Sequence, residues 1–211
     1  MVYDIAHITR DVRVALDENR RSEPLLTEED VDTLSLEEIV RGKIEAAARI
    51  VTAQAPRQLL DGGRPLGDAV FWRENGAGWT LLPDDFMRLL IFKMCDWERP
   101  VYEAIAEEDA RYGMQYSRYG GLRGNPQKPV VAIVRRSVGL VLEFFSCRSR
   151  EAHVEQGLYL PLPRLDRGNG IEIPPRLYSS VVYEAAALVA LSIGEREMAA
   201  GLSETSKQLL I

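Results

Sequence analysis

The sequence predicts an α+β fold. Helices from both ends of the chain form one helical bundle, and a β-rich segment is inserted in the sequence between them. The strongest helical periodicity of apolar residues lies in residues 4–55 and 176–209. Between these regions, short apolar runs alternate with turns rich in Gly and Pro, which is typical of strands. We therefore expect a helical body of residues 1–60 and 171–211. Residues 61–170 are expected to form a small antiparallel sheet or a barrel-like domain.

Two helices are predicted near the N-terminus. Asp4 is placed to cap the first, whose apolar residues Ile5, Ile8, Val12, Ala15 and Leu16 form one stripe. The second opens at a capping box, Ser35-Leu-Glu-Glu38, and runs to about residue 55, where Pro56 stops it. We expect the two helices to form an antiparallel pair, joined by the polar and acidic residues 19–34.

The middle of the chain predicts several short strands. Val130 begins a run that is almost wholly apolar, and residues 139–147 alternate, so residues 135–139 are expected to connect a hairpin. Pro161 and Pro163 favour an edge strand over residues 157–165. Residues 101–112 are predicted to be helical. Residues 84–98 fit either a helical stripe or a buried strand. The other predicted strands cover residues 69–73 and 79–83.

The last forty residues contain two further helices. Pro174 and Pro175 suit the first turn of an Ala-rich helix over residues 176–193, and Gly194 suits its end. A final helix places Met198, Leu202 and Leu209 on one face. Apolar faces of this kind need another helix to cover them, and the strong candidates are the two helices near the N-terminus.

Composition limits the possible functions. The chain has 211 residues, a formal charge of −6 and a pI of about 5.1, which argues against a nucleic-acid binder or an anionic-membrane binder as a whole. Cys95 and Cys147 lack the spacing of a thiolate metal site or a disulfide framework. The N-terminus shows no secretory signal, and the apolar run over residues 177–193 contains several polar residues. We expect a buried helix there, and a protein that works or assembles in a reducing cytoplasm.

No catalytic, cofactor-binding or metal-binding residue is predicted. The sequence contains no P-loop, no GxGxxG, no HExxH, no GxSxG and no EF-hand loop. Its two histidines are His7, within the first predicted helix, and His153, near Glu151 and Glu155. A metal site normally needs three or four ligands, so His153 is expected to be a solvated loop residue.

The strongest candidate surface is the loop of residues 113–129. It combines the cations Arg118, Arg123 and Lys128 with tyrosines that include Tyr119. Arg and Tyr are enriched at protein interfaces, which predicts contact with a partner. The same residue types also contact phosphates and stack on bases, and a solvated loop is the remaining alternative.

The order of elements resembles the head-to-tail adaptor proteins of bacteriophages, also known as connector or head-completion proteins, including the tubular tail adaptors. The residues that carry the resemblance span about residues 79–211. They are Leu82-Pro-Asp-Asp-Phe-Met-Arg-Leu-Leu90, Trp97-Glu-Arg-Pro-Val101, Arg123-Gly-Asn-Pro-Gln-Lys-Pro129, Tyr159-Leu-Pro-Leu-Pro-Arg164 and Ile173-Pro-Pro-Arg-Leu-Tyr178. In these proteins the segment after the first motif is extended, which favours a strand over residues 89–95.

The resemblance implies a virion structural protein at the head–tail junction, assembled in the host cytoplasm. It implies a homo-oligomeric ring, commonly of about twelve subunits, below the portal protein and joined to tail or nozzle proteins. Double-stranded DNA would pass through without specific binding, and neither a membrane, a cofactor nor an enzymatic step is implied. Ala186 and Ala190, on a second face of the Ala-rich helix, are expected to contact neighbouring subunits.

Two rival hypotheses remain open. The first is a small α+β enzyme or ligand-binding domain, which would have a deep pocket lined by polar groups. The candidate lining residues are Glu143, Arg135 and His153. An interaction adaptor of a different, host-side assembly would share the surface features but not the partners.

Overall fold

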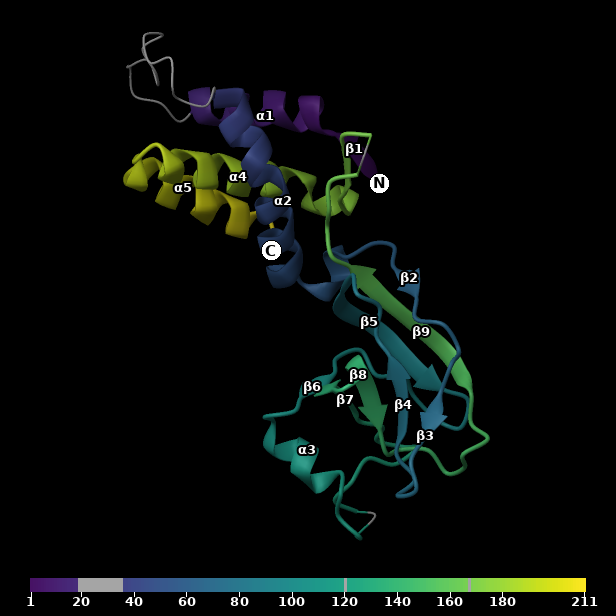
Figure 1. The fold of residues 1–211 in the computed structure, drawn as a ribbon. Coiled ribbons are helices and arrows are strands. Elements are labelled where there is room, and N and C mark those ends of the chain that lie inside the picture. The colour runs from purple at the N-terminus through teal and green to yellow at the C-terminus, as the bar shows by residue number, and fades with distance from the viewer. Residues whose placement is uncertain (19–35, 120, 167) are drawn as a thin grey trace. The chain divides into compact units, whose positions relative to one another are not determined.

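The computed structural model describes residues 1–18, 36–119, 121–166 and 168–211, and it divides into two compact units. Residues 1–62 and 163–211 form one, here called the helical unit, and residues 63–162 form the other, the β unit. The predicted α+β class is confirmed, with helices from both ends of the chain and a β-rich middle (Figure 1).

Four helices make up most of the described part of the helical unit: α1 (Ile5–Glu18), α2 (Leu36–Gln54), α4 (Tyr178–Ser192) and α5 (Arg196–Gln208). Helix α4 packs against each of the other three (Figure 1), and it is buried on almost every face. Its small side chains allow this, because alanine lets a neighbouring helix approach closely. The core therefore joins residues from both ends of the chain: Ile8, Val12, Ile44, Val51, Val181, Val189 and Leu202.

Short elements complete the helical unit. Strand β1 (Val2–Asp4) pairs antiparallel with β10 (Gly170–Glu172), and the 3-10 turns η1 (Arg57–Leu59) and η2 (Pro175–Leu177) precede the β unit and α4 in sequence. The β1–β10 pair draws residues 163–170 into the helical unit, although the sequence placed them in the inserted part.

Most helix boundaries follow the sequence signals. The Asp4 carboxylate accepts a hydrogen bond from the Ala6 N–H at 2.8 Å, and Gly194 ends α4 with a φ of 91°. Ser35 of the predicted capping box lies outside the described residues. The predicted antiparallel pair of the first two helices is wrong, because α2 crosses α1 in Figure 1 and its apolar stripe packs against α4.

The β unit contains two sheets. The first has the order β3-β4-β8-β7-β6, and the second has the order β2-β9-β5. The bounds are β2 (Arg64–Pro65), β3 (Phe71–Trp72), β4 (Gly78–Leu81), β5 (Phe86–Met94), β6 (Ile105–Ala106), β7 (Val131–Arg136), β8 (Gly139–Phe144) and β9 (Val154–Pro161). Side chains of both sheets form one core, in which Phe92 of β5 lies 5.3 Å from Phe144 of β8 between ring centroids.

Two predictions for this unit are wrong and one alternative is settled. Residues 86–94 form strand β5, as the resemblance favoured. The predicted helix over residues 101–112 is reduced to α3 (Ala110–Met114). Val101 exchanges two backbone hydrogen bonds of 2.8 Å with Phe92 and so belongs to a bridge between strands. Asp109 is the N-cap residue of α3, so the helix begins only at Ala110. Strand β9 lies in the middle of its sheet rather than at an edge, and it accommodates Pro161 at its last position.

Candidate partner interface

The loop of residues 113–129 is held firmly at its base. Gln115 is buried, and its side chain donates to the Arg111 carbonyl at 3.0 Å and accepts from the Gly124 N–H at 2.8 Å. A turn follows in which the Asn125 side chain accepts from the backbone N–H of Lys128 at 3.0 Å. These bonds tie both halves of the loop together, so residues 116–119 and 121–123 are presented on a fixed support.

Gly124 allows the loop to lie close to the sheet. A Cβ at this position would stand 2.3 Å from the Ser146 hydroxyl and 3.1 Å from the Gln115 side-chain oxygen. No larger residue fits there without displacing its neighbours. The Ser146 hydroxyl is itself fixed, because it accepts from the Val130 N–H at 3.0 Å.

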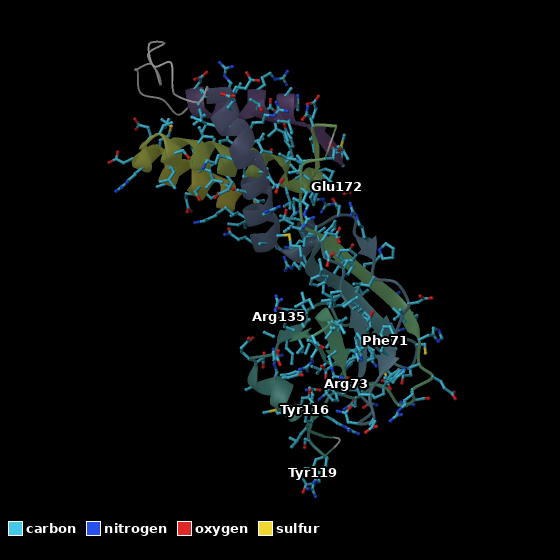
Figure 2. All side chains as sticks on the ribbon, in the orientation of Figure 1. Phe71, Arg73, Tyr116, Tyr119, Arg135 and Glu172 are labelled. Carbon is cyan, nitrogen blue, oxygen red and sulfur yellow. The ribbon has the colours of Figure 1, made fainter. Side chains whose placement is uncertain are left out.

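Between these fixed points the loop exposes large side chains. Tyr119 is 67% exposed and Leu122 is 58% exposed, and Arg118 and Arg123 are exposed beside them. Figure 2 shows Tyr119 projecting from the loop, beyond Tyr116. Exposed Tyr, Leu and Arg side chains on a rigid base have the composition of a protein-binding surface.

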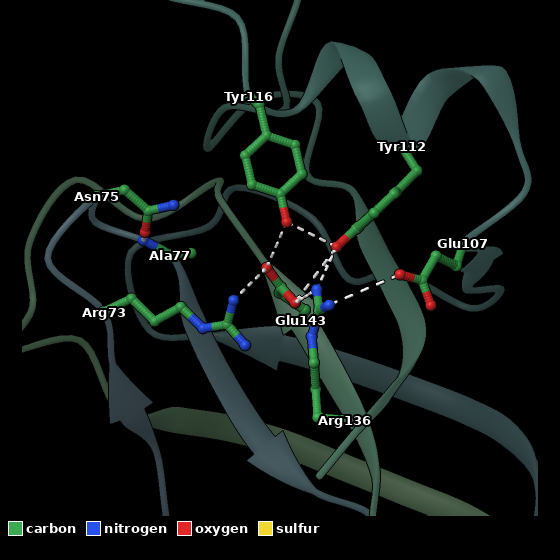
Figure 3. Close-up of polar contacts among 8 residues, drawn as sticks. All are labelled: Arg73, Asn75, Ala77, Glu107, Tyr112, Tyr116, Arg136 and Glu143. Carbon is green, nitrogen blue, oxygen red and sulfur yellow. Dashed lines mark hydrogen bonds and ion pairs between the residues drawn. The ribbon is translucent and has the colours of Figure 1, made fainter.

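A buried carboxylate anchors the loop from below. Glu143 of β8 is fully buried, and its oxygens contact Arg136 Nη2 at 2.8 Å, Tyr116 Oη at 3.1 Å and Arg73 Nη1 at 3.6 Å (Figure 3). Tyr112 of α3 completes the cluster, since Arg136 donates to its hydroxyl at 2.6 Å. The two tyrosine hydroxyls lie 2.7 Å apart, so α3 and the start of the loop are fixed to the sheet through Glu143.

Tyr112 and Arg136 hold their protons tightly in this cluster. Burial, the hydrogen bond with Tyr116 and the charge of Glu143 raise the pKa of the Tyr112 hydroxyl well above its usual range. The hydrogen bond to Glu143 raises the pKa of the Arg136 guanidinium further above its usual range. Both groups therefore keep their protons at neutral pH, whereas a general acid or base works best with a pKa near the working pH.

The same sheet face carries a second aromatic feature. Phe71 and Trp79 stack with ring centroids 4.6 Å apart, and Trp79 is in register with Glu143. Because paired residues of neighbouring strands share a face, this stack lies on the face that bears the Glu143 cluster. Phe71 is about half exposed, so this face of the sheet presents an aromatic side chain to solvent.

The residues proposed for an enzyme or ligand site do not come together. Arg135 and Glu143 lie on opposite faces of the five-stranded sheet, because Glu143 is paired with Ala132, three residues before Arg135. Arg135 lines a separate pocket of about 370 Å³ with Glu107 and Glu108. His153 is exposed and precedes β9 in the other sheet.

The predicted interface residues have different outcomes. Arg118, Tyr119, Arg123 and Lys128 are all exposed on the loop. Ala186 and Ala190 are fully buried in the core of the helical unit, so their predicted contact with neighbouring subunits is wrong. An Ala-rich second face of a helix is needed here for packing within the chain.

The sequence did not reveal the Glu143 cluster as a unit. The available signal was a single carboxylate among the apolar residues of β8, which must find cations if it is buried. Its partners come from three other places in the chain: Arg73, Arg136, and the pair Tyr112 and Tyr116. No motif in the sequence links these three places to Glu143.

The described part of the chain shows no metal site and no membrane span. Within residues 1–18, 36–119, 121–166 and 168–211, no three His, Cys, Asp or Glu side chains gather as a metal ion would require. No helix among the described residues has the length and apolar character needed to cross a membrane.

Neither a known protein family nor a curated protein sequence matches this chain.

Proposed function

We propose that this protein is a head-to-tail adaptor of a bacteriophage virion, which forms a ring below the portal protein and joins the capsid to the tail. The observation that carries the proposal is the loop of residues 113–129, rigid at its base and exposing Tyr119, Leu122 and Arg118. Such a surface favours contact with another protein. The ring is proposed on the resemblance over residues 79–211.

The distribution of charge supports passage of DNA without specific binding. The β unit contains 13 Lys and Arg residues and 13 Asp and Glu residues, so the formal charge of −6 lies on the helical unit. A channel that attracted phosphates strongly would hold DNA back, since each phosphate contact adds to the affinity. Binding between subunits and to the portal and tail proteins then relies on many contacts repeated by symmetry.

Electron microscopy of the purified chain with portal particles tests the proposal. We expect a ring, of about twelve subunits, added to the portal. Tyr119→Ser should weaken the addition by about 30-fold or more, because truncating a central interface tyrosine costs roughly 2 kcal/mol. Tyr102→Ser changes another exposed tyrosine of the same unit and should leave assembly unchanged.

The same experiment can refute the proposal. If the chain remains monomeric with portal particles and with tail proteins, the adaptor function is wrong. If a ring forms equally well with Tyr119→Ser, the loop is not the contact surface.

A further inference from the structure

A small pocket opens beside the loop, between the β3–β4 turn and the segment after β8. It has a volume of about 230 Å³. Trp72 and Phe145 contribute apolar wall, Asn75 contributes an amide, and three arginines line the remainder: Arg123, Arg148 and Arg150. None of these arginines belongs to the Glu143 cluster.

The guanidinium groups of this pocket are short of negative partners. Arg150 donates to the backbone carbonyl of Glu74 at 2.7 Å, and Arg148 lies 3.9 Å from the exposed carboxylate of Glu98. Among the residues that the structure describes, no carboxylate pairs with Arg123 or with Arg150. Two uncompensated positive charges facing one concave site favour an anionic ligand.

The fold places Arg123 at this pocket through its neighbour. The N–H of Gly124 is bonded to Gln115, and its missing side chain lets the loop approach Ser146. Arg123 is thereby fixed beside the segment of residues 145–150, although the two are distant in sequence. The position of the Arg123 backbone beside the pocket is thus set by the base of the loop.

The Asn75 amide adds a second donor type. Its oxygen accepts from the Ala77 N–H at 3.1 Å, so its nitrogen is the group that remains to donate. Planar guanidinium groups together with an amide N–H match the two oxygens of a carboxylate. The apolar rings of Trp72 and Phe145 suit the methylene carbons that carry such a carboxylate.

We infer that this pocket binds the carboxylate of an Asp or Glu side chain from a partner protein. The inference rests on the proposal that the β unit contacts another protein, and it names the chemistry of that contact. A side chain fits the volume, which is below the roughly 300–1,000 Å³ of sites for drug-sized ligands.

A nucleic-acid backbone fits the surroundings less well. Arg148 is shared with Glu98, its backbone N–H donates to the Asp96 carboxylate, and Glu74 is exposed in the turn that lines the pocket. A single carboxylate can enter between these acidic groups, whereas a polyanion that crosses the surface would meet their repulsion. Backbone binding also calls for a continuous basic groove, and the β unit has no excess of positive charge.

Chemical-shift mapping by NMR tests the inference with a capped tetraglutamate peptide as the probe. We expect a dissociation constant of about 1 mM, with shifts confined to residues 121–124, 72–76 and 145–150. A capped tetraglutamine peptide is the neutral probe and should cause no such shifts. Oligothymidine tests the nucleic-acid alternative, and binding as tight as that of tetraglutamate would overturn the inference.

Two variants make the test specific. Arg123→Gln combined with Arg150→Gln should weaken tetraglutamate binding by about 10-fold or more, because charge-assisted hydrogen bonds are lost. Arg99→Gln removes an exposed charge from the same unit but from neither the pocket nor the loop, and should change affinity less than about two-fold. Unaltered affinity in the double variant, or no shifts in the original protein, would overturn the inference.

The outcomes also separate this inference from the adaptor proposal. Peptide binding without ring formation would support the carboxylate pocket and refute the adaptor function. Ring formation without any peptide binding would refute the carboxylate pocket alone.

Discussion

Replacing Glu143 by glutamine should destabilise the β unit selectively. The substitution keeps the volume and one acceptor oxygen, but it removes the charge that faces Arg136 at 2.8 Å and Arg73 at 3.6 Å. Arg73 then loses its carboxylate partner, and Arg136 keeps the carboxylate of Glu107 at 3.6 Å, whose side chain is 42% exposed. The buried Nε of Arg136 already has no hydrogen-bond partner among the described residues, and Glu143 at 2.8 Å is closer to Arg136 than Glu107 at 3.6 Å.

The magnitude follows from how open the cluster is. Breaking a fully buried ion pair costs about 3–5 kcal/mol. Here Glu143 is fully buried, but the side chains of Arg136 and Arg73 are 27% and 35% exposed, so water can solvate them in part. We therefore expect a loss of about 2–3 kcal/mol in the free energy of unfolding of the β unit.

Tryptophan fluorescence in urea reports the unfolding of the β unit specifically, and therefore measures this loss of stability. The chain has three tryptophans, Trp72, Trp79 and Trp97, and all lie in the β unit. The fluorescence midpoint should fall by about 1–2 M urea at a typical slope for a domain of this size. Circular dichroism, dominated by the helical unit, should show a separate transition that does not move.

The matched control is Glu155→Gln. Glu155 pairs with Lys93 at 2.8 Å in the same unit, but its side chain is 41% exposed. An exposed pair contributes about 0–1 kcal/mol, so this variant should shift the fluorescence midpoint little. If Glu143→Gln shifts it no more than Glu155→Gln does, the Glu143 cluster does not hold the loop and the reasoning is wrong.

Three other predictions follow from the packing. Gly124→Ala should destabilise the β unit by about 1–3 kcal/mol, measured by fluorescence in urea, and combining it with Ser146→Ala should recover part of the loss, because the clash is with the Ser146 hydroxyl. Ala186→Leu should lower the thermal midpoint of the helical unit seen by circular dichroism, since this side chain is fully buried; normal stability with blocked assembly would contradict its burial. Iodoacetamide should modify the exposed Cys95 well before Cys147, because burial and the charge of Asp96 raise the pKa of the Cys147 thiol; equal rates by mass spectrometry would contradict this.

Local signals in the sequence located most elements well. Asp4 and Gly194 marked helix ends because capping depends on residues next to the helix itself. The helix predicted over residues 101–112 failed for the opposite reason. Its apolar spacing fits a helix, but Val101 is bound to Phe92 in a bridge that only the folded sheet supplies.

The candidate surface was predicted in part. Arg118, Tyr119, Arg123 and Lys128 could be proposed because residue type alone distinguishes an interface-like loop. Ala186 and Ala190 could not be assigned correctly, because small residues suit contacts within a chain and between chains equally. Only the packing of α4 against α1, α2 and α5 shows that these two side chains lie inside.

The sequence by itself determined the α+β class, the helices at both ends of the chain and the exposed loop of residues 113–129, because periodicity and turn residues act over short distances. The tertiary structure alone decided which side chains meet. The register of the sheet places Glu143 next to Arg73 and Arg136. The close approach of the loop at Gly124 places Arg123 in one pocket with Arg148 and Arg150. These encounters depend on long-range pairing, which no local pattern in the chain encodes.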